Sequence, residues 1–183
     1  MAASGGEGEQ RFIYVTDDVE HRVWRLALPM MEFQLVCGSV AGLKDGPGSA
    51  AQLKGPSGIA VSGEWLYFAD ELNHAVRGVD LKSFEVSTVA GNGISGYEDG
   101  VGDLARFRNP RGIAVGAAGG VVGGRLTIYV TESMNHCVRA IDVSHPLRRV
   151  ALIMKSKSET LNCVRAIDVR HFLLAKTFAL KEN

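Results

Sequence analysis

Three histidines recur within a repeated sequence pattern: His21, His74 and His136. Three neutral imidazoles that converge on one point can bind zinc, so these residues could form a metal site. Alternatively, each histidine lies at the same turn of its own repeat, where a ring nitrogen bonds to nearby backbone or to an acidic side chain. Because the histidines keep their place in the repeat, we favour the structural role and predict no metal and no cofactor.

An acidic residue precedes an arginine by seven positions in two places, Asp70 with Arg77 and Glu132 with Arg139. If each pair spans a strand, a turn and the next strand, the carboxylate and the guanidinium can form an ion pair between adjacent strands. A carboxylate of this kind could instead be a catalytic acid or base. Since the arrangement repeats, we again favour a structural role.

Two acidic, glycine-rich segments, residues 45–48 and 98–103, superficially suggest calcium loops. A calcium ion takes about six to eight oxygen ligands, with carboxylates at alternating positions. The first segment offers one carboxylate and the second offers three without that spacing, so tight turns explain both better. The string at 91–96 matches Gly-x-Gly-x-x-Gly, but no helix follows it as a dinucleotide site requires.

All of these residues belong to a pattern with a period of 53–54 residues. A Pro-x-Gly-Ile-Ala-Val sequence occurs at 56–61 and again at 110–115, and an apolar stretch around a tyrosine recurs in phase with it. Within one period, four short apolar or alternating stretches are bounded by Gly, Pro, Asn or Asp, at 58–62, 65–70, 75–80 and 85–91. Four short antiparallel strands in a repeat of about 40–50 residues are typical of a β-propeller blade.

The repeats resemble the NHL family. The resemblance rests on Asn-His-Ala-Val-Arg at 73–77 and Asn-His-Cys-Val-Arg at 135–139, each preceded by the tyrosine strand and the Pro-x-Gly-Ile-Ala-Val sequence. It covers residues 11–143 and implies a β-propeller, often with six blades. The first copy departs from the pattern, because it lacks the Asn and has Trp24 where the later copies have arginine.

The end of the chain has a different composition. The formal net charge is zero, but residues 1–143 carry a net charge of −5 and residues 144–183 carry +5. Residues 162–169 nearly copy 135–143 with one histidine deleted, too close to the original to hold a full blade. We therefore divide the chain into a flexible N-terminus (1–10), an NHL-repeat segment (11–143) and a basic tail with a partial duplicated repeat (144–183).

Cysteine content and hydropathy place limits on the compartment. Cys37, Cys137 and Cys163 are odd in number and widely spaced, unlike a disulfide framework or a zinc motif. We expect Cys37, which follows an apolar stretch, in the core and not as a nucleophile. The sequence has no readable signal peptide and no run of about 18 apolar residues. These features predict a cytoplasmic protein with no membrane attachment.

We expect an all-β fold, an incomplete β-propeller of about three four-stranded blades, the last one incomplete. This is fewer than the ~4–8 blades of a closed propeller. Such an arc has an exposed edge that must be covered, paired or left prone to aggregate. A homodimer that completes the ring is one way to cover it, and a truncated product without independent function is another interpretation.

The leading functional hypothesis is a non-catalytic module that binds a protein or peptide through propeller loops. The longest expected loops are 91–108 and 116–125, and the aromatic candidates for contact are Trp65 and Tyr97. RNA binding is the alternative, through the basic tail and three arginines, Arg106, Arg108 and Arg111. A metal-dependent lyase or hydrolase of the six-bladed type is a third hypothesis.

Overall fold

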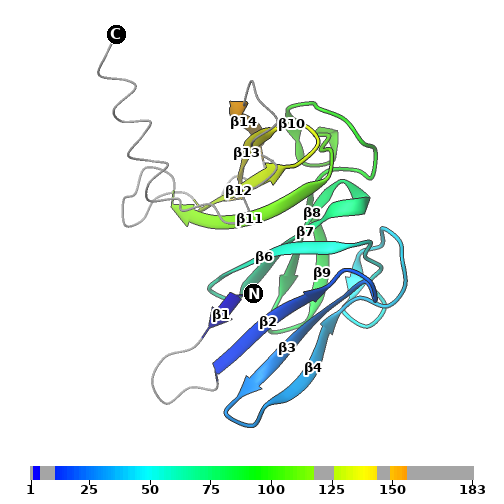
Figure 1. Ribbon diagram of the computed structural model, residues 1–183, viewed down its shortest axis with the longest axis vertical. Coiled ribbons are helices and arrows are strands. Elements are labelled where there is room, and N and C mark those ends of the chain that lie inside the picture. The colour runs from blue at the N-terminus through cyan, green and yellow to red at the C-terminus, as the bar shows by residue number, and fades with distance from the viewer. Residues whose placement is uncertain (1, 5–10, 118–125, 144–148, 156–183) are drawn as a thin grey trace.

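The computed structural model describes residues 2–4, 11–117, 126–143 and 149–155. These residues form three antiparallel sheets, which Figure 1 shows with the first at the bottom, the second in the middle and the third at the top. The first sheet contains β1 (Ala2–Ser4), β2 (Arg11–Asp17), β3 (Arg22–Leu28) and β4 (Glu32–Cys37). We call the three sheets the first, second and third blade.

The second and third blades share one plan. The second contains β6 (Pro56–Ser62), β7 (Trp65–Asp70), β8 (Ala75–Asp80) and β9 (Glu85–Ala90). The third contains β11 (Pro110–Ala117), β12 (Leu126–Glu132), β13 (Cys137–Asp142) and β14 (Arg149–Lys155). In each blade every strand pairs with the next one in sequence, which is the meander expected of a propeller blade.

The segments that connect the blades add a fifth strand to the blade that follows. β5 (Gly46–Pro47) pairs with the outermost strand of the second blade, β9, and β10 (Gly100–Val101) pairs with β14 of the third. We call residues 38–55 the first linker and 91–109 the second linker. Each linker therefore crosses over the next blade to its outer edge before it enters the inner strand. Short 3-10 turns are η1 (Glu71–Asn73) and η2 (Gly102–Leu104).

The all-β prediction is confirmed, and the strands expected at 58–62, 65–70, 75–80 and 85–91 correspond to β6, β7, β8 and β9. The third blade differs from the expectation. It was expected to be incomplete, but β14 gives it a fourth strand from residues that the composition assigned to the tail. In the expected flexible N-terminus, β1 pairs with β2. Residues 156–183 with the duplicated copy at 162–169, and most of the loop at 116–125, lie outside the described residues.

Alternating side chains join the blades face to face. Leu66 and Phe68 of β7 pack in one core cluster with Tyr14 of the first blade. Tyr67, between them in sequence, points to the opposite side and packs in a second cluster with Ile128 of the third blade. Successive side chains of a strand point to opposite faces, so β7 serves both interfaces.

The linkers fill the space between blades. Leu53 and Ala51 of the first linker are fully buried in the core between the first and second blades. Phe107 and Ala105 of the second linker are fully buried in the core between the second and third. The linkers are therefore parts of the hydrophobic core and not only connections.

The inner strands of neighbouring blades approach closely at Gly58. A Cβ atom at this position would lie 2.2 Å from the carbonyl oxygen of Arg111, which no side chain can tolerate without backbone movement. The neighbouring Ser57 hydroxyl donates to the same carbonyl at 3.2 Å. In turn, the Thr16 hydroxyl of the first blade donates to the Ser57 carbonyl at 2.8 Å. Polar contacts thus tie the three blades together along β6.

We expect Gly58→Ala to lower the stability of the chain by about 1–3 kcal/mol, because the methyl group forces β6 and β11 apart. For a chain of this size each kcal/mol lowers the melting temperature by about 2–4 °C. Thermal unfolding followed by circular dichroism measures the shift. The matched control is Gly63→Asn, since Gly63 faces open space and Asn tolerates its positive φ. Equal shifts for both variants would contradict the close approach.

Candidate functional site

Two buried ion pairs occupy equivalent places in the second and third blades. Arg77 Nη1 lies 2.7 Å from Asp70 Oδ2, and Arg139 Nη1 lies 3.1 Å from Glu132 Oε1. All four side chains are fully buried. In each pair the carboxylate stands at the end of one strand and the arginine on the next, as the seven-residue spacing predicts.

The linker completes each site. Arg77 Nη2 donates to Asp45 Oδ1 at 2.8 Å and to the Lys44 carbonyl at 2.9 Å. Arg139 Nη2 donates to Asp99 Oδ1 at 2.7 Å and to the Glu98 carbonyl at 2.6 Å. The acidic glycine-rich segments therefore bring a second carboxylate to each guanidinium, which explains their place in the repeat without calcium.

The asparagine of the repeat joins the same network. Asn73 Nδ2 donates to Asp70 Oδ2 at 2.8 Å and to the Gly42 carbonyl of the first linker at 2.7 Å. Asn135 makes the equivalent bonds to Glu132 and to Gly96. Burial raises the pKa of Asp70, while the bonds from Asn73, the Lys54 N–H and Arg77 oppose this rise. These groups hold the blade and its linker together, with Asp70 and Glu132 fully buried and Asp45 and Asp99 about half exposed.

Two of the histidines join one blade to the linker that leads into the next. His21 Nδ1 accepts a hydrogen bond from the Gly55 N–H at 3.2 Å, and His74 Nδ1 accepts one from the Asn109 N–H at 3.3 Å. His21, His74 and His136 all have positive φ, near 55°. The three rings sit on separate blades. In the part of the chain that the structure describes, no group of three or more His, Cys, Asp or Glu side chains could hold a metal ion.

The pKa of His74 is lowered, first by burial and then by the charges of Arg108 and Lys54. A histidine with a folded pKa below its unfolded value stabilises the fold above the unfolded pKa, and that stability is lost as pH falls below about 6.5. We therefore expect the melting temperature to fall between pH 7 and 5.5 by more in the parent chain than in His74→Asn. Asn removes the titration and keeps the left-handed backbone. Identical pH profiles would contradict this role.

In the part of the chain that the structure describes, the first blade has no buried ion pair equivalent to those of the other two blades. Trp24 stands opposite Val15 on the neighbouring strand, as Arg77 stands opposite Phe68. Tryptophan thus occupies the arginine position, and Asp17 occupies the position of Asp70. Among the described residues, Asp17 Oδ1 accepts hydrogen bonds from the backbone N–H groups of Val19 and Glu20, at 3.1 Å and 2.9 Å.

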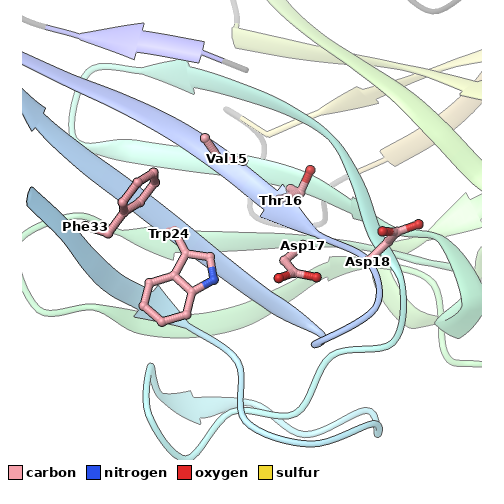
Figure 2. A pocket seen from close by; sticks show the side chains of 6 residues that line it. All are labelled: Val15, Thr16, Asp17, Asp18, Trp24 and Phe33. Carbon is pink, nitrogen blue, oxygen red and sulfur yellow. The ribbon is translucent and has the colours of Figure 1, made fainter. Parts of the chain in front are cut away.

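A pocket of about 510 Å³ opens on this face of the first blade. Figure 2 shows Trp24 and Phe33 on neighbouring strands, with Asp17 and Asp18 at the end of β2. Val15 and Thr16 complete the lining. Phe33 is 64% exposed, unlike the side chains on the same face of the second blade, where Leu66 and Phe68 are fully buried. We call this cavity the Trp24 pocket.

The aromatic candidates for contact lie apart. Trp65 begins β7, stacks on Tyr67 with ring centroids 6.2 Å apart, and lines a smaller pocket of about 180 Å³. Tyr97 lies in the second linker, 43% exposed, with its ring 5.6 Å from the Arg139 guanidinium. Trp65 is thus at the opposite end of β7 from Glu71, which contacts Arg111. The structure does not place Trp65 beside the arginines proposed for RNA contact.

Two of the arginines proposed for RNA contact have acidic partners. Arg106 Nε lies 3.5 Å from Glu98, and Arg111 Nε lies 3.8 Å from Glu71. Arg108 is exposed, and its backbone N–H donates to Glu132 at 2.6 Å. Arg106 and Arg111 therefore each lie beside a carboxylate.

Cys37 lies in the core, as expected. Burial raises the pKa of its thiol to about 12, so the thiolate that a nucleophile requires is not available near neutral pH. Cys137 is also buried. None of the helices in the described ranges combines the length and the apolar character needed to cross a membrane.

Sequence comparisons find similar repeats in longer proteins. No protein-family profile matches the chain. NHL repeat-containing protein 2 from Homo sapiens is 33% identical over 107 residues, which is 57% of this chain and 15% of that protein. Protein SUPPRESSOR OF QUENCHING 1, chloroplastic, from Arabidopsis thaliana is 31% identical over 104 residues, 56% of this chain and 9% of that protein. The matched stretch thus spans a small part of these relatives.

Structural comparisons agree on the architecture. An auxiliary nutrient binding protein from Bacteroides thetaiotaomicron matches 82% of this chain and 35% of its own, with a TM-score of 0.57 and 18% identity. A protein of unknown function from the same organism matches 77% of this chain and 31% of its own, with a TM-score of 0.56 and 22% identity. At this identity the likeness concerns the fold alone. Taken with the recurring Asn-His-x-Val-Arg sequences and the three meander sheets, these comparisons show that the repeats of this chain are similar to those of NHL repeat-containing protein 2 and that they fold as part of a β-propeller.

Proposed function

We propose that the chain is a non-catalytic interaction module that binds a protein or peptide partner. The observation that carries this proposal is which side chains are buried and which are exposed. Arg77 and Asp70 are buried and bonded to each other, and the same guanidinium binds Asp45, whose side chain is 48% exposed. Large apolar side chains, by contrast, are exposed on the first blade and on the second linker, including Phe33 at 64% and Leu104 at 68%.

A rigid β scaffold that presents exposed apolar side chains favours binding over chemistry. Interfaces are enriched in aromatic residues and depleted of Lys, Glu and Asp at their centres. The Trp24 pocket has two aromatic side chains on neighbouring strands, and the second linker adds Tyr97 and Ile94, which is 53% exposed. Both surfaces belong to elements anchored in the core, so binding requires little ordering of the backbone.

The experiment is selection of peptides from a displayed random library with the full 183-residue chain as bait, followed by calorimetric titration of the enriched peptides. We expect saturable binding with one peptide per chain or per dimer. Elemental analysis and a panel of ester, phosphoester and lactone substrates are run on the same preparation. Stoichiometric zinc or calcium with turnover would overturn the non-catalytic role, and so would the absence of any binding peptide.

RNA binding stays a prediction and ranks second. Its support is the net charge of +5 over residues 144–183, together with exposed Arg108. The acidic partners of Arg106 and Arg111 count against it. If RNA binds, the affinity for a single-stranded oligonucleotide must fall steeply between 50 and 200 mM salt, as roughly one counterion is released per phosphate contact. Absent or salt-insensitive binding would exclude it.

The homodimer is a further proposal about partners. The Nδ1 of His136 is buried and has no hydrogen-bond partner among the described residues. The equivalent atoms of His21 and His74 each accept an N–H from the linker of the following blade. A second copy that supplies such a linker would satisfy His136. Light scattering after size exclusion measures the mass, and a strictly monomeric chain at high micromolar concentration would contradict the dimer.

A further inference from the structure

We propose that the Trp24 pocket binds an arginine side chain of a partner polypeptide, together with an apolar residue next to that arginine. This inference rests on the proposed function as an interaction module and specifies one site and the chemistry of its ligand. The bound guanidinium takes the place that Arg77 and Arg139 fill inside the other two blades.

Trp24 and Asp17 of the first blade stand at the positions of Arg77 and Asp70 in the second. In the second blade Phe68 pairs with Arg77, and Asp70 is two residues beyond Phe68 on β7. In the first blade Val15 pairs with Trp24, and Asp17 is two residues beyond Val15 on β2. The first blade thus keeps the carboxylate and has no guanidinium at the position of Arg77; Arg22 stands opposite Asp17 itself on β3.

Within the described part of the chain, the Asp17 carboxylate has fewer hydrogen-bond partners than the Asp70 carboxylate. Asp70 binds one backbone N–H with Oδ1, while its Oδ2 accepts from Asn73 and from Arg77. Asp17 also satisfies Oδ1 with backbone N–H groups, those of Val19 and Glu20. Its Oδ2 has no hydrogen-bond partner in the ranges that the structure describes. That oxygen corresponds to the atom that binds the guanidinium in the second blade.

The Trp24 pocket combines acidic side chains with the face of an indole ring. Asp17 and Asp18 line the pocket, and the described residues that line it include no basic side chain. The face of an indole attracts cations within about 6 Å. The guanidinium of Arg22 lies 5.9 Å from the centroid of the Trp24 ring, and its Nη1 is 3.8 Å from the Glu20 carboxylate. A planar guanidinium can stack on the ring and still reach Asp17, which an ammonium cannot do as well.

Exposed apolar side chains beside the Trp24 pocket indicate that the ligand also has an apolar part. In the second blade the linker that binds Arg77 also buries Leu53 in the same interface. In the first blade the corresponding surface has Phe33 and Leu35 exposed, at 64% and 38%. A volume of about 510 Å³ can hold an arginine side chain and a neighbouring aliphatic one. The ligand is therefore an extended segment with arginine beside leucine or a residue of similar size.

The test uses Trp24 as its own reporter. The full chain carries two tryptophans, so Trp65→Phe leaves the emission of Trp24 alone. The probe is the capped peptide Ac-Leu-Arg-Leu-NH₂, compared with versions that carry lysine or citrulline in place of arginine. We expect saturable quenching by the arginine peptide with a dissociation constant of about 1 mM or lower. We expect several-fold weaker binding of the lysine peptide and no saturation with citrulline, which has the same shape without the charge.

Two substitutions locate the site. Asp17→Asn keeps the shape of the side chain and should weaken binding of the arginine peptide by roughly tenfold or more. Glu32→Gln, an exposed position of the same blade that does not line the pocket, is the matched control and should leave binding unchanged. Trp24→Arg removes the fluorescent reporter, so its binding is measured by calorimetric titration; it should abolish binding, because the introduced guanidinium fills the place next to Asp17. Circular dichroism and thermal unfolding establish that each variant is folded.

The results separate this inference from the proposed function. Equal binding of the arginine and citrulline peptides, or unchanged binding by Asp17→Asn, would overturn arginine recognition. No quenching by the arginine peptide up to several millimolar would also overturn it. If library-selected peptides still bind the chain in those cases, and bind Trp24→Arg equally well, the interaction module stands and its site lies elsewhere.

Discussion

Arg77→Met should lower the free energy of unfolding by about 3–5 kcal/mol, the largest effect that we expect from a single polar substitution. The substitution leaves Asp70 buried without its guanidinium, and it also removes the hydrogen bonds that hold Asp45 and the Lys44 carbonyl of the first linker. The linker and β8 then lose their common partner. Urea unfolding followed by circular dichroism measures the change.

A double substitution tests the cause. Replacing both partners, as in Asp70→Leu with Arg77→Met, removes the unpaired charge and should recover much of the stability lost in the single variant. Arg111→Met is the matched control, because the Arg111 side chain is 55% exposed with its Nε 3.8 Å from Glu71, and exposed pairs contribute about 0–1 kcal/mol. A single variant as stable as the control would contradict a structural role for the buried pair.

Phe107→Ala should destabilise the chain by about 3–5 kcal/mol, although the residue belongs to a connecting segment. The Phe107 ring is fully buried in the core between the second and third blades, and it lies 4.9 Å from the guanidinium of Arg139. Its removal leaves a cavity and also weakens the packing over a buried charge. The change is measured as a shift of the urea midpoint and of the melting temperature.

The neighbouring position Leu104 provides the control for this prediction. Its side chain is 68% exposed in the same linker, so Leu104→Ala should change the stability by less than about 0.5 kcal/mol. If both variants behave alike, the second linker is an ordinary surface loop. A large effect confined to Phe107 would establish that the linker contributes to the core.

The strands of the repeat could be predicted from sequence because their signals are local. Alternation and bounding glycines define β6 to β9, and the hairpin between β7 and β8 sets the register that brings Asp70 to Arg77. The partners of the linkers could not be predicted in this way. Asp45 meets Arg77 across 32 positions and His21 meets Gly55 across 34, distances at which no local pattern specifies a contact. These contacts depend on how the blades stack.

Two features were missed for different reasons. β14 lies in a segment whose basic composition resembles the rest of the tail, and its pairing with β13 depends on tertiary context. The Trp24 pocket did have a signal in the sequence, the tryptophan at an arginine position. That departure indicates a site only when the strand register is known. The register shows that Asp17 stands at the position of Asp70 with no arginine at the position of Arg77, and Phe33 is exposed on the same blade.

The path of the linkers also defines where this chain can be divided. Each linker supplies a strand, a carboxylate and buried apolar side chains to the blade that follows it. The segment that must fold together therefore begins at the linker and not at the inner strand of the sheet. For the second blade that segment is 38–90, and a cut between the linker and β6 would separate Arg77 from Asp45, the second carboxylate that binds it. Recombination or truncation that respects 38–90 and 91–155 as modules keeps each blade intact, whereas boundaries drawn at the sheets do not.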